Sequence, residues 1–176
     1  MESASANCRM KQSGLSEITR TERYHHCDGR QLKLADSDLG LEQYRSSDYY
    51  VWSAETTIRH LLFIFPTMIN LTAITLHYYS DSDSIQGRSR SLPRLRFYAV
   101  PDDFNIWNAL TTSYGYVEIA AVPPDGQPAG RKNVSINVIF NTKKVLMQKF
   151  RSSFQFAVSE VEFFTCNSKS ITWSHP

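Results

Sequence analysis

The last third of the chain contains the clearest strand pattern in the sequence. From Val134 to Phe140 every second residue is apolar, with polar Ser135 and Asn137 between them. Because successive side chains of a strand point to opposite faces, this alternation predicts a half-buried strand. The polar segment Asn141–Lys144 is expected to turn the chain into a second strand, Val145–Phe150.

A third strand is expected from Phe154 to Phe164, where β-branched and aromatic residues are frequent. Val161 and Phe163 share one face of this strand, and Glu160 and Glu162 share the other. The two glutamates are therefore expected on the outward face. Together the three segments indicate antiparallel strands that close a β-sandwich.

The remainder of the chain repeats the same kind of pattern and shows no amphipathic helix. Proline, glycine, serine and aspartate separate short apolar segments, and Pro66 is expected to end one of them. The expected upstream strands are Gln31–Ala35, Ile58–Phe65, Ile69–Tyr79, Pro93–Pro101 and Gly115–Pro123. The sequence therefore predicts an all-β fold, an antiparallel β-sandwich or jelly roll of about eight strands.

The length of 176 residues fits one domain with tails. We expect a disordered or linker lead at residues 1–26, the sandwich at 27–166 and a C-terminal tail at 167–176. The apolar segment Leu61–Leu76 is shorter than the about 20 residues of a membrane span and contains Pro66, so two buried strands are the preferred interpretation.

The N-terminus has no apolar core of a secretory signal. The chain has three cysteines, Cys8, Cys27 and Cys166. Cys27 and Cys166 bracket the structured region, which suits a disulfide between the first and last strands of an extracellular domain. The alternative is that all three are thiols in a reducing compartment. An extracellular domain with this N-terminus would be part of a longer protein.

Several landmarks resemble the discoidin-like domains, also called coagulation-factor type C domains, within the wider galactose-binding-like sandwiches. In that family a Trp-Ser pair precedes an apolar strand, a proline turn and a strand that ends near Tyr-Ser; later strands lead to a closing cysteine. The matching residues here are Trp52-Ser53, Phe65-Pro66, Tyr79-Ser80, Leu95–Tyr98, Val145–Phe150, Phe156–Phe164, Cys27 and Cys166. The resemblance implies ligand binding through loops at one end of the sandwich.

Neither a metal site nor a cofactor is expected. His25, His26 and Cys27 lie together, but a structural zinc site needs about four ligands and no second cluster is near in sequence. Asp36 and Asp38 are the carboxylates that could offer oxygen to calcium. They lack the glycine and glutamate of a helix-loop-helix calcium loop, so a plain turn is favoured.

No catalytic motif occurs in the sequence. The acidic pairs Asp102/Asp103 and Glu160/Glu162 are expected in a turn and on an outward strand face. No nucleophile elbow, zinc-protease motif or phosphate loop accompanies them. The sequence therefore predicts a protein that is not an enzyme.

The candidate binding residues lie in loops. Exposed tyrosines beside charged groups suit sugar faces or a protein partner, although the same tyrosines could be buried under their loop. The candidate ligand-binding residues are Tyr44, Arg45, Asp48, Tyr49 and Tyr50.

A second candidate is a basic patch formed by Arg88, Arg90, Arg94 and Arg96, with Arg94 and Arg96 on one strand face. It could bind a sulfated glycan or an anionic lipid, or be a solvated face. The net charge of +2 is too small to indicate nucleic acid. Asn70 and Asn133 begin N-glycosylation sequons, which are compatible with secretion.

We therefore expect a non-catalytic extracellular recognition module that binds a glycan or a cell-surface protein through its loops. Two alternatives remain open from the sequence. One is a carbohydrate-binding accessory module of a larger enzyme, and the other is a structural protein-protein interaction domain.

Overall fold

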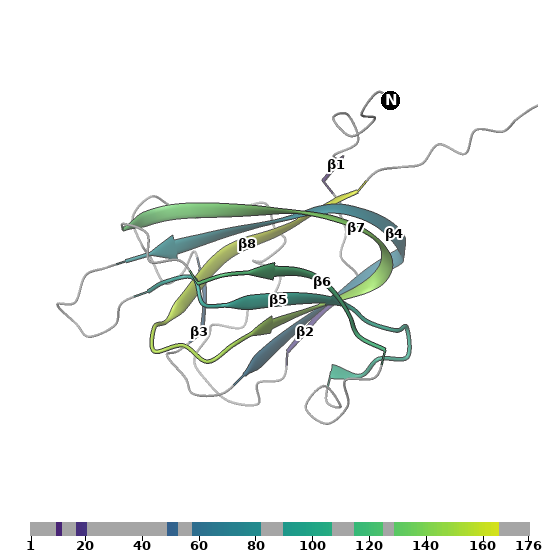
Figure 1. Cartoon of the computed structure of the whole chain (residues 1–176), viewed down its shortest axis with the longest axis horizontal. Coiled ribbons are helices and arrows are strands. Elements are labelled where there is room, and N and C mark those ends of the chain that lie inside the picture. The colour runs from purple at the N-terminus through teal and green to yellow at the C-terminus, as the bar shows by residue number, and fades with distance from the viewer. Residues whose placement is uncertain are drawn as a thin grey trace, which may run out of the picture.

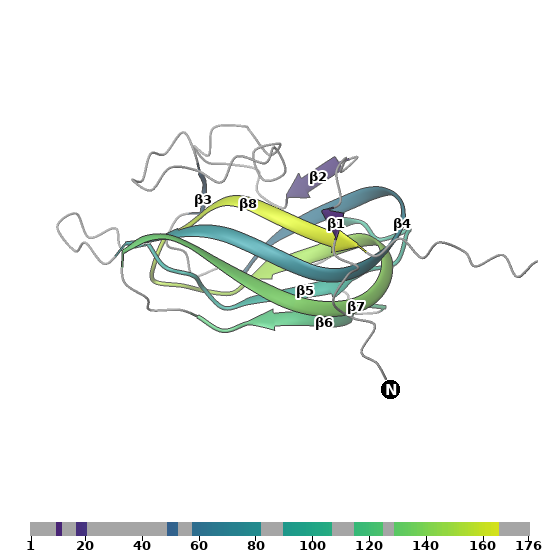
Figure 2. The ribbon, with the colours of Figure 1, turned by 90° about the horizontal axis from the view of Figure 1, so that it is seen from above.

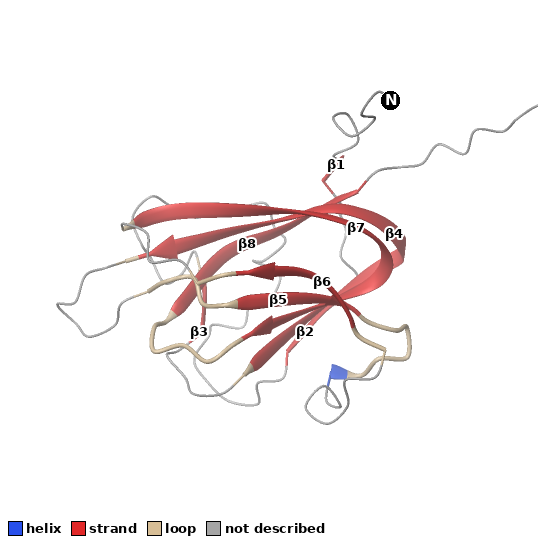
Figure 3. Cartoon of the chain, in the orientation of Figure 1, coloured by secondary structure: helices blue, strands red, loops and turns tan. Residues whose placement is uncertain are grey.

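The structure is a computed structural model that describes residues 10–11, 17–20, 49–52, 58–81, 90–106, 115–124 and 129–165. Apart from one helical residue at Ile106, these residues form strands and loops (Figure 3). The strands are β1 Met10–Lys11, β2 Glu17–Arg20, β3 Tyr50–Trp52, β4 Arg59–Ser80, β5 Leu95–Ala99, β6 Val117–Val122, β7 Gly130–Lys149 and β8 Phe156–Thr165. The predicted strand Gln31–Ala35 lies outside the described residues.

Two long antiparallel strands, β4 and β7, form the frame of the molecule, because each of them bends and belongs to both layers of a sandwich (Figures 1 and 2). We call the layer β6-β5-β7-β4-β2 the larger layer; it uses the first half of β4 and the second half of β7. The smaller layer uses the other halves and β8, whose far edge pairs with β1 and β3. The predicted antiparallel β-sandwich is therefore confirmed, and the described residues form eight strands.

The prediction that Pro66 ends a strand is wrong. Residues 59–80 form one strand, and the pairing with β7 shifts register between Ile64 and Ile69. Pro66, Thr67 and Met68 are exposed within that irregularity. Proline lacks the N–H that a regular ladder needs, and a bulge does not require it. Pro66 therefore lies where β4 bends from one layer to the other.

The predicted turn at Asn141–Lys144 is also wrong, because β7 continues through it. Asn141 and Thr142 pair with Asn70 and Ile69 on the bending part of β4. The Thr142 hydroxyl donates to the Lys144 carbonyl at 2.7 Å and accepts from the Lys144 N–H at 3.1 Å. These local hydrogen bonds resemble those of a turn. Residues that favour turns therefore form a bend here, while the strand stays paired with β4.

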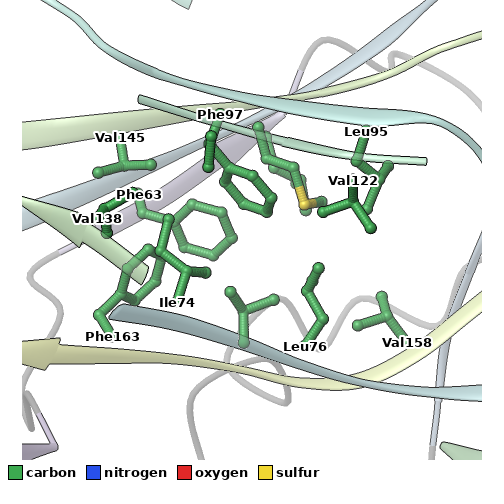
Figure 4. Close-up of a cluster of buried hydrophobic side chains, with 14 of the residues drawn as sticks. Phe63, Ile74, Leu76, Leu95, Phe97, Val122, Val138, Val145, Val158 and Phe163 are labelled. Atoms are coloured by element: carbon green, nitrogen blue, oxygen red, sulfur yellow. The ribbon is translucent and has the colours of Figure 1, made fainter. Parts of the chain in front are cut away.

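The core lies between the two layers and follows the predicted alternation. Leu95, Phe97 and Ala99 of β5 are buried, as expected from the sequence. Phe163 of β8 contacts Phe63 and Phe65 of β4 edge to face, with ring centroids 4.9 and 5.1 Å apart. Figure 4 shows this cluster with side chains from both layers. The aromatic contacts thus join the closing strand to the larger layer.

A smaller apolar cluster covers the outer face of the larger layer. Its buried members are Leu62, Val100, Ile106 and Leu146. The Lys144 ammonium donates to the carbonyls of Asp102 and Phe104, which fixes the loop over this cluster. These contacts close the end of the sandwich at which β4 and β7 bend.

The two glutamates expected on the outward face of β8 differ in their exposure to solvent. Glu160 is fully buried, and it pairs with His77 next to a register shift between His77 and Tyr78. Glu162 is partly exposed and lies 2.8 Å from His77 Nε2. A bulge changes the alternation locally, which a strict period of two does not anticipate.

The expected lead at residues 1–26 contributes two strands. β1 pairs with the end of β8, and β2 pairs with β4 at the edge of the larger layer. Edge pairing uses backbone groups, so it needs no apolar alternation in the sequence. The boundaries at residues 27 and 166 remain a prediction, and residues 167–176 lie outside the described part. No helix among the described residues is long and apolar enough to cross a membrane.

Truncation of Phe163 tests the aromatic contact between the layers. We expect Phe163→Ala to lower the free energy of unfolding by about 3–5 kcal/mol, because it removes a buried ring and leaves a cavity. Urea unfolding followed by tryptophan fluorescence measures this loss. The control is Ile139→Ala, whose side chain is 91% exposed and whose effect should stay within about 0.5 kcal/mol. Equal effects of the two variants would contradict this description of the core.

Candidate functional site

One end of the sandwich gathers the connections between the strands. There β4 ends at Ser80 beside Gly130, the start of β7, while β7 ends at Lys149 beside Leu95, the start of β5. β8 also begins at this end, with Ala157 opposite Tyr79. This is the left end in Figure 1. We call it the loop end; the bends of β4 and β7 lie at the opposite end.

An ion pair forms the base of the connection after β4. Asp81 and Arg90 exchange two backbone hydrogen bonds of 2.9 and 3.0 Å. Their side chains also meet, with Arg90 Nη1 2.9 Å from Asp81 Oδ2, and they are 16% and 19% exposed. Two backbone hydrogen bonds and an ion pair join Asp81 to Arg90. The two residues that flank the connection 82–89 are therefore held together.

The segment 90–94 runs beside the connection between β7 and β8. The Ser91 N–H donates to the Gln155 carbonyl, and the Phe150 N–H donates to the Arg94 carbonyl, both at 3.0 Å. Two connections far apart in the sequence therefore share one rim of the loop end. We call this the 90–94/150–155 rim.

Arg94, which directly precedes β5, and Arg96, within β5, both lie over the ring of Phe150. Each guanidinium carbon lies 5.2 Å from the centre of the Phe150 ring. Arg96 also pairs with Glu118 at 3.3 Å. Hydrogen bonding to the Tyr98 hydroxyl, with a smaller attraction from Glu118, raises the pKa of Arg96, so this group stays charged.

The arginines of the predicted basic patch therefore differ in whether an acidic residue pairs with them. Arg90 has Asp81 as its counter-ion and Arg96 has Glu118. Arg94 is exposed, and its side chain makes no hydrogen bond or ion pair within the described part of the chain. Arg88 lies outside the described residues.

Phe154 is a candidate that the sequence analysis placed inside a strand. It lies in the connection before β8, and its side chain is 43% exposed. The Phe154 N–H donates to the Ser152 hydroxyl at 3.1 Å, which shapes the turn. An aromatic residue directly after two serines between strong strands is the signal that could have identified it.

The predicted tyrosine loop is only partly described. Tyr44, Arg45 and Asp48 lie outside the described residues, and Tyr50 is described only as part of β3. Tyr49 is 4% exposed and packs edge to face on Tyr79 at 5.8 Å. A ligand can therefore reach little of the Tyr49 side chain. Its buried position suits a structural role in packing the loop end.

The two sequons differ in their surroundings. Asn133 is exposed on β7, whereas Asn70 is half buried and pairs with Asn141. A glycan would therefore fit more readily at Asn133. Cys27 and Cys166 lie outside the described residues.

His60 is a buried histidine on the outer face of the larger layer. It is 2% exposed, and its Nε2 lies 3.0 Å from the Gln148 amide nitrogen. Because that amide nitrogen can only donate, Nε2 accepts. A proton on His60 Nε2 would place two hydrogen-bond donors, the ring N–H and the Gln148 amide N–H, next to each other without an acceptor. Burial lowers the pKa of His60 to about 4.

The described residues contain no group of three histidine, cysteine, aspartate or glutamate side chains that could hold a metal ion. Asp102 and Asp103 lie exposed in a turn near the bends, away from the loop end. Among the described loops, the loop end thus offers an aromatic ring and arginines, which suit binding rather than proton transfer.

Comparisons of sequence find no relative for this chain. No protein-family model matches it, and no curated protein matches it.

Comparisons of structure do find similar folds. The family 32 carbohydrate-binding module of Clostridium perfringens NanJ, solved with galactose, aligns with a TM-score of 0.54 at 7% identity over 84% of this chain and 92% of its own. A Streptococcus pneumoniae fucose-binding module aligns at 0.54 with 14% identity over 85% and 90%. A fucolectin from striped bass (Morone saxatilis) serum aligns at 0.58 with 15% identity over 85% and 46%. The discoidin-like, galactose-binding-like fold expected from the resemblance is therefore confirmed.

Buried neutral His60 makes stability depend on pH. Its folded pKa of about 4 lies below the about 6.5 of an unfolded histidine, so the unfolded chain takes up the proton first. We expect the contribution of His60 to the free energy of unfolding to fall by about 3 kcal/mol from pH 7 to pH 4. Urea unfolding across this range measures it. His60→Gln should lack this part of the fall, and His77→Gln should keep it; a slope unchanged in His60→Gln would contradict the assignment.

Proposed function

We propose that this chain is a non-catalytic module that binds a glycan at its loop end. The observation that carries the proposal is the exposed ring of Phe154 at the end of the sandwich where the connections converge. Phe154 precedes Gln155, whose backbone bridges that of Arg90, the partner of Asp81 in the ion pair. An exposed aromatic ring can stack on the apolar face of a sugar, and ion-paired side chains can hydrogen-bond its hydroxyls.

The arrangement of the loop end supports this proposal. The 90–94/150–155 rim is fixed by backbone hydrogen bonds, so Phe154 and Arg94 stand on connections whose bases do not need to rearrange. A site that is already ordered loses less entropy when a ligand binds. The edge-to-face contact between Tyr49 and Tyr79 stabilises the same end of the sandwich.

The similar structures agree with this class of function, because they include modules described as binding galactose and fucose. The same role would serve an adhesion receptor or a carbohydrate-active enzyme, since in either case the module supplies binding. A purely structural interaction domain is the competing function, and it predicts self-association without glycan binding.

Removal of the Phe154 ring tests the proposed site. We expect Phe154→Ala to weaken glycan binding by about tenfold or more, because the ring supplies the stacking surface. A glycan array followed by titration calorimetry measures the affinity, and thermal melting shows that the fold is kept. Ile139→Ala removes an exposed apolar side chain near the bends and should leave binding unchanged.

Two results would contradict the proposed function. Absence of binding to any glycan, together with self-association in solution, would favour the structural domain. Equal loss in Phe154→Ala and Ile139→Ala would place the ligand elsewhere on the molecule.

We further propose that the domain is extracellular and that Cys27 and Cys166 form a disulfide. In the described part of the chain, Thr165 pairs with Met10, so Cys8 is the competing partner of Cys166. The intact mass after alkylation, with and without prior reduction, should differ by one pair of alkyl groups. Cys27→Ser should abolish the difference and Cys8→Ser should retain it; the reverse result would assign the bridge to Cys8.

A further inference from the structure

The described part of the 90–94/150–155 rim carries more positive than negative charge. By sequence, the connections 53–58, 81–94, 123–129 and 150–155 contain four basic and four acidic residues, so the loop end as a whole has no net excess. Among the connection residues that the structure describes, Asp81 is the acidic one, and it pairs with Arg90. Arg94 and Arg151 are the other described basic residues of these connections, and both are exposed. The described rim is therefore locally positive.

Phe150 contacts two arginines that differ in exposure and in their counter-ions. Arg94 and Arg96 lie at the same 5.2 Å from the centre of the ring. Arg96 has Glu118 as a counter-ion at 3.3 Å. Arg94 is exposed, and its side chain has no acidic partner within the described residues. The ring thus orders a guanidinium whose charge is not balanced by a described neighbour.

A stacked guanidinium still exposes its N–H edge to solvent. That planar edge matches the oxygens of a carboxylate or a sulfate, which it can bind through two parallel hydrogen bonds. Arg151, on the same rim, is also exposed. The rim therefore combines an aromatic ring for a sugar face, Phe154, with arginines for an acidic substituent.

We propose that the loop end prefers acidic glycans, and that Arg94 binds the carboxylate or sulfate group of the sugar. This inference rests on the proposed function and specifies its ligand class. Arg94 is the contact residue, Phe150 orients its guanidinium, and Arg151 adds positive charge to the rim. Arg96 is not a contact residue, because its guanidinium already pairs with the Glu118 carboxylate.

The experiment compares ligands that differ only in charge. Titrations use a neutral galactan, a polygalacturonate and a sulfated galactan such as carrageenan, at about 0.15 M and about 0.5 M salt. We expect the acidic ligands to bind at least about tenfold more tightly than the neutral one at the lower salt. The preference should shrink at the higher salt, where charges are screened. The two acidic ligands distinguish a carboxylate from a sulfate.

The matched variants separate a specific contact from net charge. Arg94→Glu should abolish the preference for acidic ligands. Lys143→Glu makes the same change in net charge near the bends, away from the loop end, and should keep the preference. Arg94→Lys keeps the charge but loses the planar edge, so it should retain only part of the preference. Thermal melting of each variant shows that the fold is intact.

The outcomes distinguish this inference from the proposed function. Binding of the neutral galactan alone, unaffected by Arg94→Glu, would overturn the inference and leave the proposed function standing. Equal losses in Arg94→Glu and Lys143→Glu would reduce the preference to net charge and overturn the assignment of Arg94. Binding to phosphatidylserine vesicles with no binding to any glycan array component would overturn both.

Discussion

The structure depends on the antiparallel pairing of β4 with β7 along almost their whole lengths. The pairing begins at Arg59 with Lys149 and ends at Ser80 with Gly130, interrupted by two register shifts. Each strand is too long for one layer of a small sandwich, so both bend together and continue in the other layer. The bend requires local irregularity, and Pro66–Met68 and Thr142 supply it. The two layers are consequently one continuous sheet folded on itself.

This construction determines where a ligand can bind. One end of the sandwich is closed by the bends and by a loop held over Leu62 and Leu146 through Lys144. The other end is left to the connections, whose backbones are joined to each other by the bonds of Ser91 and Phe150. Loops can vary in sequence without disturbing the core, and a rigid frame keeps their bases in place. A recognition site is therefore expected at the loop end.

The same construction bears on two of the buried polar residues of the described strands, His60 and Glu160. His60 lies buried beside Gln148 on a strand that belongs to the frame, so its surroundings cannot relax to hydrate a charged ring. Glu160 is buried next to the irregularity that joins β8 to β4. Both are polar groups removed from water, so each depends on partners inside the protein.

The sequence by itself determined the fold class and the faces of β5 and much of β8, because alternation with period two is a local property. The tertiary structure alone decided that Pro66 and Asn141–Lys144 are bends rather than ends, since that depends on a partner strand far away in the sequence. It also decided that Glu160 is buried, that Tyr49 packs on Tyr79, and that Phe154 is exposed. Exposure and partnership are properties of packing between segments, and no pattern within one segment contains them.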